Sequence, residues 1–248
     1  MMKIVDVRGI VLSETNYSES SKILNVLTED YGLIGVISKG SRNMKSKLRG
    51  VSRRLIYGTF HIYYKEDGLS TLIGVDVINS YNNILSDLSR ISYSSYLLDL
   101  VRQVLKESDD KNIYKLLLDV LEKINDGFDP LVLTNMFELK MLDYLGVKPN
   151  IDECSVCGNK KDIITISASY GGFICSNCFK GDDKIVSPKV IKMIRMYYYV
   201  DISKIDKLNV SYDIKEAINR FLDDYYERYT GLYLKSKDFI KRIEILDK

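Results

Sequence analysis

Short apolar runs separated by turn signals fill the first 80 residues. These runs are rich in β-branched and aromatic side chains, which favour strands, and they are broken by glycine. The pattern predicts strands at residues 3–12, 22–28, 33–38, 55–65 and 69–78, with hairpin turns at Asp30-Tyr31-Gly32 and Glu66-Asp67-Gly68. Five short strands at this spacing predict a small closed or nearly closed β-barrel.

The hydrophobic period changes near Asn82, where apolar residues begin to recur every three or four positions. This period is typical of amphipathic helices. It predicts helices at residues 82–105, 112–124, 130–145, 188–199, 214–229 and 236–246. The third of these has signals at both ends, because Asp129 can cap it, Pro130 suits its first turn and Gly146 supplies a stop.

Residues 150–183 interrupt the helical pattern with several glycines, all four cysteines and two short β-like pieces at 163–168 and 172–175. The whole pattern therefore predicts an α+β protein. A barrel domain at residues 1–80 precedes a mostly α-helical domain at residues 81–248, into which residues 150–183 are inserted as a separate module.

Composition narrows the range of functions. The 248 residues are 46% hydrophobic and 28% charged, which is ordinary for a soluble globular protein. There is one histidine, His61, and no tryptophan, which argues against histidine-based metal sites and catalysis. No apolar leader follows Met1-Met2-Lys3, and no uncharged run approaches the ~20 residues of a membrane-spanning helix. We expect a cytoplasmic protein with reduced thiols and no enzymatic activity.

The four cysteines form two pairs, Cys154-x2-Cys157 and Cys175-x2-Cys178, with 17 residues between the pairs. Two residues between paired ligands let a tight turn direct both sulfurs at one ion, and four thiolates at this spacing typically surround one tetrahedral Zn²⁺. Four buried free thiols or a thioredoxin-like redox pair are the alternatives, although a redox motif needs only one pair. Because no nearby histidine or glutamate indicates an open coordination position, we predict one structural Zn²⁺.

Charge is nearly balanced overall, at 36 Lys+Arg against 34 Asp+Glu, but it is uneven along the chain. No acidic residue occurs between Tyr31 and Tyr64, where the local charge is +7. The basic residues of this segment are Lys39, Arg42, Lys45, Lys47, Arg49, Arg53 and Arg54. Loops at the rim of an OB-type barrel flank the face that holds oligonucleotides, so we predict that these seven residues contact phosphates. A solvated basic loop without a partner is the alternative.

Four aromatic residues follow the basic segment on one predicted strand: Tyr57, Phe60, Tyr63 and Tyr64. Since strand side chains alternate, half of them must face the core, and the exposed half are candidates to stack on bases. His61 lies in the same strand, and we expect it to be an ordinary hydrogen-bonded residue without a catalytic role.

Several longer segments carry a family resemblance. They are residues 9–12, 17–24 and 27–33, Lys39-Gly40-Ser41-Arg42 with Ser46-Lys47-Leu48-Arg49-Gly50, residues 137–146 and the four-cysteine insert. Together, and over the whole chain, these segments resemble the RecO family of bacterial recombination mediators.

The resemblance implies an N-terminal OB-fold, a helical C-terminal domain and a zinc module. It also implies that the protein binds single- and double-stranded DNA, anneals complementary strands, and works with RecR to help RecA displace single-strand-binding protein. An apolar groove between helices is expected to hold the tail of that protein, and nucleoid association is expected. The residues alone leave open a zinc-ribbon protein of transcription or translation that uses the basic barrel on RNA, whereas an enzyme is the least supported alternative.

Overall fold

The computed structural model describes the backbone of residues 3–246 and the side chains of residues 3–242. The chain forms two compact units, Met1–Asn125 and Asp126–Lys248. Within residues 3–246, no helix combines the length and the apolar composition that crossing a bilayer requires.

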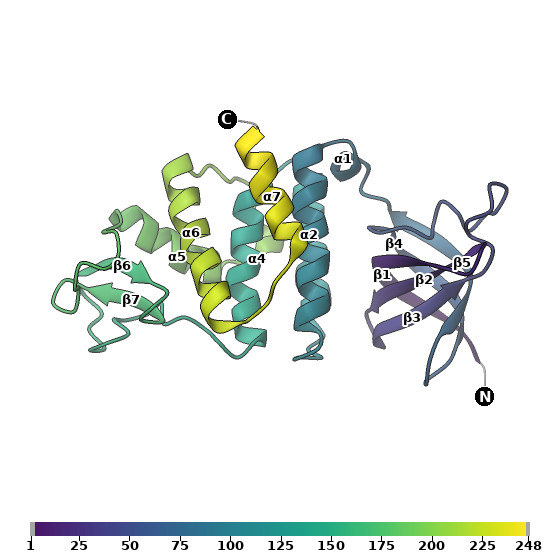
Figure 1. Cartoon of the computed structure of the whole chain (residues 1–248), viewed down its shortest axis with the longest axis horizontal. Coiled ribbons are helices and arrows are strands. Elements are labelled where there is room, and N and C mark those ends of the chain that lie inside the picture. Colours follow the sequence, from purple (N-terminus) through teal and green to yellow (C-terminus); the bar gives the residue numbers. More distant parts are fainter. Residues whose placement is uncertain (1–2, 247–248) are drawn as a thin grey trace. The chain divides into compact units, whose positions relative to one another are not determined.

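The first unit begins with a closed five-stranded barrel (Figure 1). Its strands are β1 (Lys3–Tyr17), β2 (Ser21–Thr28), β3 (Gly32–Ser38), β4 (Tyr57–Tyr64) and β5 (Ser70–Asn79). The strand order is β1-β2-β3-β5-β4, with β1 antiparallel to both β2 and β4 and with β3 parallel to β5. This is the Greek-key arrangement of an OB-fold, so the predicted barrel is confirmed.

Alternation along the strands builds the barrel core. Apolar side chains from all five strands, together with Ile56, form one buried cluster: Val7, Val11, Leu24, Val26, Val36, Ile56, Phe60, Ile62 and Leu72. β1 runs five residues beyond its predicted end, because Ser13–Tyr17 continue to pair with β2 after a bulge between Val11 and Ser13.

Three helices complete the first unit: α1 (Asn82–Leu85), α2 (Leu88–Val104) and α3 (Asn112–Asn125). The prediction of one continuous helix at residues 82–105 was wrong, because the chain leaves helical geometry at Asp87, with φ −130°. The Asp87 carboxylate accepts a hydrogen bond from the Arg90 backbone N–H at 2.7 Å. Asp87 therefore acts as the N-cap that begins α2.

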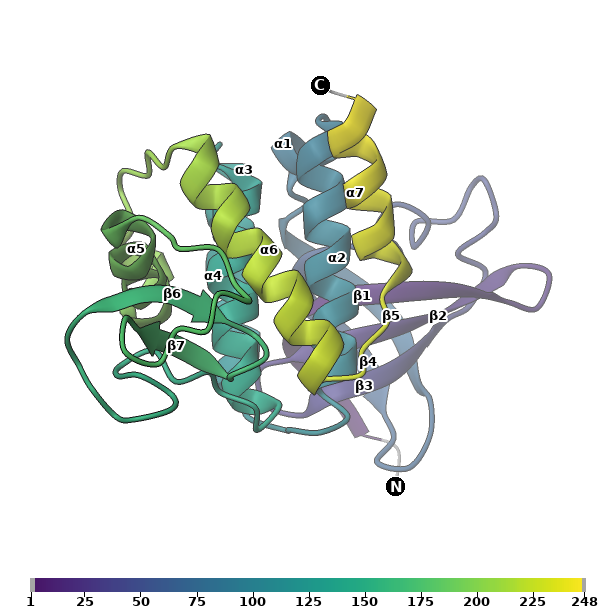
Figure 2. The same cartoon turned by 60° about the vertical axis from the view of Figure 1, so that its left-hand side comes forward.

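The second unit is mostly helical and contains a two-stranded sheet. Its elements are α4 (Pro130–Tyr144), β6 (Ile163–Ser167), β7 (Gly172–Cys175), α5 (Pro188–Tyr199), the short 3₁₀ helix η1 (Ile202–Lys204), α6 (Tyr212–Tyr229) and α7 (Lys235–Leu246). Figure 2 shows β6 and β7 side by side, next to α5. The predicted cap of α4 is confirmed, since Asp129 accepts from the backbone N–H groups of Leu131 at 3.0 Å and Val132 at 3.2 Å.

Candidate metal centre and nucleic-acid interface

The structure brings the four predicted cysteine ligands together in the second unit. The sulfurs of Cys154, Cys157, Cys175 and Cys178 all lie within 4.8 Å of one another. Cys154 and Cys175 are buried, whereas Cys157 is exposed and Cys178 is half-buried. The first pair lies in the loop before β6, and the second pair begins at the last residue of β7.

Backbone hydrogen bonds shape the turn of each pair. The Gly158 N–H donates to the Cys154 carbonyl at 2.9 Å, and the Cys178 N–H donates to the Cys175 carbonyl at 3.1 Å. Burial raises the pKa of Cys154, but hydrogen bonds from the backbone of Cys175, Cys157 and Val156 outweigh it and lower that pKa to about 6. The thiolate, which is the form that binds metals, is therefore favoured at Cys154.

Glycine at position 172 lets β7 approach the segment that leads to the first pair. Gly172 has φ +152°, and a Cβ there would lie 2.1 Å from the Asn150 carbonyl oxygen. Next to it, the Phe173 N–H donates to that carbonyl at 2.8 Å and the Ser155 N–H donates to the Phe173 carbonyl at 2.8 Å. These bonds hold both cysteine pairs in one fixed register.

The spacing of the sulfurs suits one tetrahedral ion. Zn–S bonds of about 2.3 Å place neighbouring sulfurs about 3.8 Å apart in a tetrahedron. The Cys157 and Cys175 sulfurs are 3.6 Å apart, and the whole cluster fits within 4.8 Å. The four cysteines are therefore placed so that they could hold a metal ion.

The basic loop, residues 39–54, connects β3 to β4 in the first unit. Buried serines hold this loop at its two ends. Ser38 and Ser52 join through their hydroxyls at 2.7 Å, and the Ser41 hydroxyl donates to the Ser38 carbonyl at 2.9 Å. Leu48 packs against the barrel core. The loop is thus held at both ends and near its middle. Ser38 and Ser52 are 14 residues apart, too far for a local sequence pattern to indicate their contact.

Five of the seven predicted phosphate contacts are exposed on this loop, and two are half-buried. The exposed residues are Lys39, Arg42, Lys45, Lys47 and Arg49. Of the half-buried pair, Arg53 donates to the Gly50 carbonyl at 3.2 Å, whereas Arg54 turns toward α2, where its Nη2 lies 2.9 Å from Asp99 Oδ1. A phosphate contact by Arg54 stays a prediction, and the structure gives this side chain a protein partner.

The aromatic candidates separate by burial. Phe60 is 1% exposed in the barrel core, so it cannot stack on a base. Tyr63 is 42% exposed and Tyr57 is half-buried. The Tyr64 ring lies 4.8 Å from the ring of Tyr31, measured between centroids. Tyr63 is therefore the most accessible of the four.

His61 lies on the outer face of the barrel between two carboxylates that sequence reasoning missed. Its Nδ1 is 2.7 Å from Asp6 Oδ1 and its Nε2 is 3.0 Å from Asp76 Oδ2. The hydrogen bond to Asp6, followed by that to Asp76, raises the pKa of His61 above its ordinary value. Only the strand pairing, which sets Asp6 opposite His61 on β1 and β4, could have indicated the first of these partners.

Comparisons with known proteins match nearly the whole chain. The family model described as "Recombination protein O N terminal" matches residues 2–81, and "Recombination protein O C terminal" matches residues 85–238. A protein of Bacillus pumilus named DNA repair protein RecO is 36% identical over 248 residues, which cover 99% of this chain and 96% of that protein. Proteins of the same name are 34% identical in Listeria monocytogenes serotype 4b, over 95% of this chain and 93% of theirs, and 33% identical in Halalkalibacterium halodurans, over 95% and 94%.

Proposed function

The chain belongs to the RecO family of DNA repair proteins, and we propose that it is a DNA-binding recombination mediator. In this proposal it binds single- and double-stranded DNA, anneals complementary strands and, with RecR, helps RecA assemble on DNA coated by single-strand-binding protein. The observation that carries the proposal is the basic loop, an acid-free segment with five exposed cations on an OB-fold barrel.

Annealing breaks no covalent bond, so the protein needs no catalytic residue for it. Two phosphate backbones repel each other, and a surface that neutralises phosphates while leaving the bases free lowers that barrier. Lys39, Arg42, Lys45, Lys47 and Arg49 supply this surface, with Arg53 and Arg54 at the end of the same loop. These contacts position the strand and read little of its sequence.

The metal that best fits the four-cysteine cluster is one structural Zn²⁺, bound by Cys154, Cys157, Cys175 and Cys178. A bound Zn²⁺ would cross-link the two cysteine pairs and stabilise the module at residues 150–183. All four ligands are protein sulfurs, which supports a structural role for the ion and no catalytic one.

In this proposal, each of the two domains that the sequence predicts has its own role. Residues 1–80, the OB-fold, bind DNA, and the helical residues 81–248, with the module at 150–183, supply surfaces for RecR and for the tail of single-strand-binding protein. RecA is engaged indirectly. The protein acts in the cytoplasm, in association with the nucleoid.

A strand-annealing assay tests the proposal. Two complementary oligonucleotides, bare or coated with single-strand-binding protein, are mixed with the wild type and with Arg42→Glu/Lys45→Glu/Lys47→Glu. Lys106→Glu/Lys111→Glu/Lys115→Glu is the matched control, because it reverses three exposed lysines of the same unit outside the loop. We expect the wild type and the control to accelerate annealing without a nucleotide, and the loop variant to lose most of the acceleration.

Three outcomes would contradict the proposal or its DNA site. If the wild type does not accelerate annealing, the protein is not a mediator of this kind. If it binds RNA and not DNA, the zinc-ribbon alternative replaces it. Equal activity of the loop variant and the wild type would place the DNA site elsewhere.

A further inference from the structure

The second unit has its own basic segment without acidic residues. Residues 184–200 contain four basic and no acidic residues, and α5 supplies three of the four, at intervals of three positions: Lys189, Lys192 and Arg195. The same helix buries Val190, Ile194 and Tyr197. α5 is therefore an amphipathic helix whose charged residues are all cationic, and its exposed side carries Lys189 and Lys192 beside Met196 and Tyr199.

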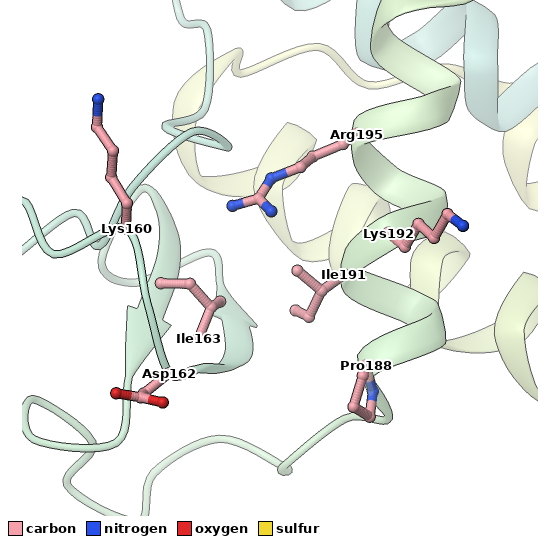
Figure 3. Close-up of a pocket in the computed structure, with 7 residues that line it drawn as sticks. All are labelled: Lys160, Asp162, Ile163, Pro188, Ile191, Lys192 and Arg195. Carbon is pink, nitrogen blue, oxygen red and sulfur yellow. The ribbon is translucent and has the colours of Figure 1, made fainter.

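A cleft of about 430 Å³ lies between α5 and the four-cysteine module. It is lined by Lys160, Asp162, Ile163, Pro188, Ile191, Lys192 and Arg195. In Figure 3, Ile163 and Ile191 point toward each other across the cleft, and the Arg195 guanidinium reaches into it from α5. The ammonium groups of Lys160 and Lys192 point away from this apolar floor, on opposite sides. The cleft thus has an apolar floor, and the lysines at its rim extend their ammonium groups outward into solvent.

Arg195 fixes the distance between the two walls. Its Nε donates to the Ile151 carbonyl at 2.9 Å and its Nη2 to the Asp152 carbonyl at 3.2 Å, and its guanidinium lies 5.1 Å from the centre of the Phe173 ring. On the next turn of α5, the Tyr199 hydroxyl donates to Asp152 Oδ1 at 2.7 Å. These contacts tie α5 to the segment just before Cys154, so the cleft is a preformed feature of the fold.

The charged and apolar residues in and around the cleft indicate the class of ligand that it would bind. The lining has two exposed lysines, Lys160 and Lys192, against one carboxylate, Asp162. Exposed Lys161 and Lys189 are next to lining residues in the sequence, so the cleft and its surroundings suit a ligand with repeated negative charges. The floor of Ile163, Pro188 and Ile191 suits a ligand that also offers apolar surface. Single-stranded nucleic acid has both features, because its phosphates follow the strand and its unpaired bases expose their faces.

We propose that this cleft is a second DNA-strand site, which holds one strand while the basic loop holds the other. The inference rests on the proposed function, since it assigns to each unit one of the two strands that annealing must bring together. Phosphates contact Lys160, Lys189 and Lys192 along the rim, and bases or sugars contact the apolar floor without reading sequence.

The test measures whether one protein holds two strands. Two non-complementary oligonucleotides, one carrying a donor and one an acceptor dye, are mixed with the protein, and energy transfer reports their joint binding. The cleft variant is Lys160→Glu/Lys189→Glu/Lys192→Glu, which leaves Arg195 and its structural contacts intact. The matched control, Lys204→Glu/Lys207→Glu/Lys235→Glu, reverses three exposed lysines of the same unit that do not line the cleft.

We expect the cleft variant to lose about tenfold or more of the joint-binding signal and of the annealing rate, since three phosphate contacts become repulsive. Binding of a single labelled strand should change by less than about threefold, because the basic loop is untouched. The control should match the wild type in every measurement. Retained metal content and an unchanged melting curve show that the cleft variant is folded.

Joint binding by the cleft variant at the wild-type level would overturn the inference and leave the proposed function standing. If the wild type binds no DNA at all, both fail together. The cleft also suits an acidic peptide, so a labelled peptide of four aspartates and one isoleucine is titrated in parallel. Peptide binding that the cleft variant loses while it keeps joint DNA binding would also overturn the inference.

Discussion

The Arg54 guanidinium lies 2.9 Å from the Asp99 carboxylate, across 45 residues of sequence. The same guanidinium donates to the Ser95 carbonyl at 3.1 Å, and the Arg54 backbone N–H donates to Glu14 at 2.8 Å. Arg54 therefore joins the end of the basic loop to α2 and to β1. Arg54, one of the seven basic residues, is therefore held by side-chain and backbone contacts within the protein.

Replacing Arg54 should affect stability more than DNA binding. We expect Arg54→Ala to lower the free energy of unfolding of the first unit by about 1–2 kcal/mol, since it removes a partly exposed ion pair and a hydrogen bond to a carbonyl. A denaturant titration measures this, and a double-mutant cycle with Asp99→Ala isolates the coupling. The affinity of folded Arg54→Ala for single-stranded DNA should fall less than that of Arg42→Ala. A larger loss for Arg54→Ala would make Arg54 a direct DNA contact.

The number of phosphate contacts that the basic loop makes can be measured from the salt dependence of DNA binding. If about four of its cations contact one strand, the logarithm of the binding constant should fall with the logarithm of salt concentration at a slope of about −3. Each Lys→Gln substitution at Lys39, Lys45 or Lys47 should make this slope less negative by about 0.7. Fluorescence titrations from low to moderate salt measure the slope, and Lys115→Gln serves as the control. A slope near zero would exclude phosphate contacts as the main source of affinity.

Metal removal should unfold one module and spare the barrel. We expect one Zn²⁺ per chain in the purified protein, and we expect chelation to abolish the hydrogen-exchange protection of β7 while the first unit keeps its melting temperature. Cys154→Ser should retain less than one metal per chain, whereas Ser176→Ala, a change inside the second pair that removes no ligand, should retain it. Elemental analysis measures the metal content, and hydrogen exchange measures the protection of β7. A folded module without stoichiometric metal would refute the structural role.

The stability of the barrel should depend on the protonation of His61. The folded-state pKa of His61 is raised by Asp6 and Asp76, so protonated His61 contributes stability that is complete below the unfolded-state value of about 6.5. This contribution is lost as pH rises through the folded-state pKa. We expect the melting temperature of the wild type to fall by about 1–4 °C relative to His61→Gln between pH 6 and pH 8. If the melting temperatures of the two proteins change with pH in the same way, protonated His61 does not stabilise the barrel.

A buried ion pair should make α7 essential for the stability of the second unit. Lys237 Nζ lies 2.6 Å from Glu138 Oε1, and the Glu138 side chain is 1% exposed. Burial lowers the pKa of Lys237, but Glu138 and Asp223 outweigh it and raise that pKa, so the lysine is charged.

Lys237→Met should lower the free energy of unfolding by about 3 kcal/mol, because it removes the Lys237 ammonium from beside a buried carboxylate. Glu138→Gln/Lys237→Met should recover most of this loss. Denaturant titrations compare the two variants with Lys241→Met, in which an exposed lysine is removed from the same helix. If Lys237→Met and Lys241→Met lower the free energy of unfolding equally, the buried Lys237–Glu138 pair contributes no more stability than an exposed pair.

Local patterns predicted the elements and the ligand spacing, because both depend on neighbours in the sequence. Short runs of β-branched and aromatic residues between turn signals predicted the five strands, and the two Cys-x2-Cys pairs indicated the metal cluster. Partners distant in sequence were not predictable in this way. Lys237 and Glu138 are 99 residues apart, and α4 is buried on every side from Val132 to Leu139, so no period marks Glu138 as an inward-facing charge. The acid-free stretch along α5 was visible in the sequence, but only the fold sets it beside the module.

The buried serines that pin the basic loop have a kinetic consequence. Ser38, Ser41 and Ser52 hold the two ends of the loop in place through hydrogen bonds. In the proposed function, a DNA strand that binds the loop would therefore not have to order these ends first. We therefore expect diffusion and electrostatic steering, rather than a slow rearrangement of the loop, to set how quickly a strand is captured.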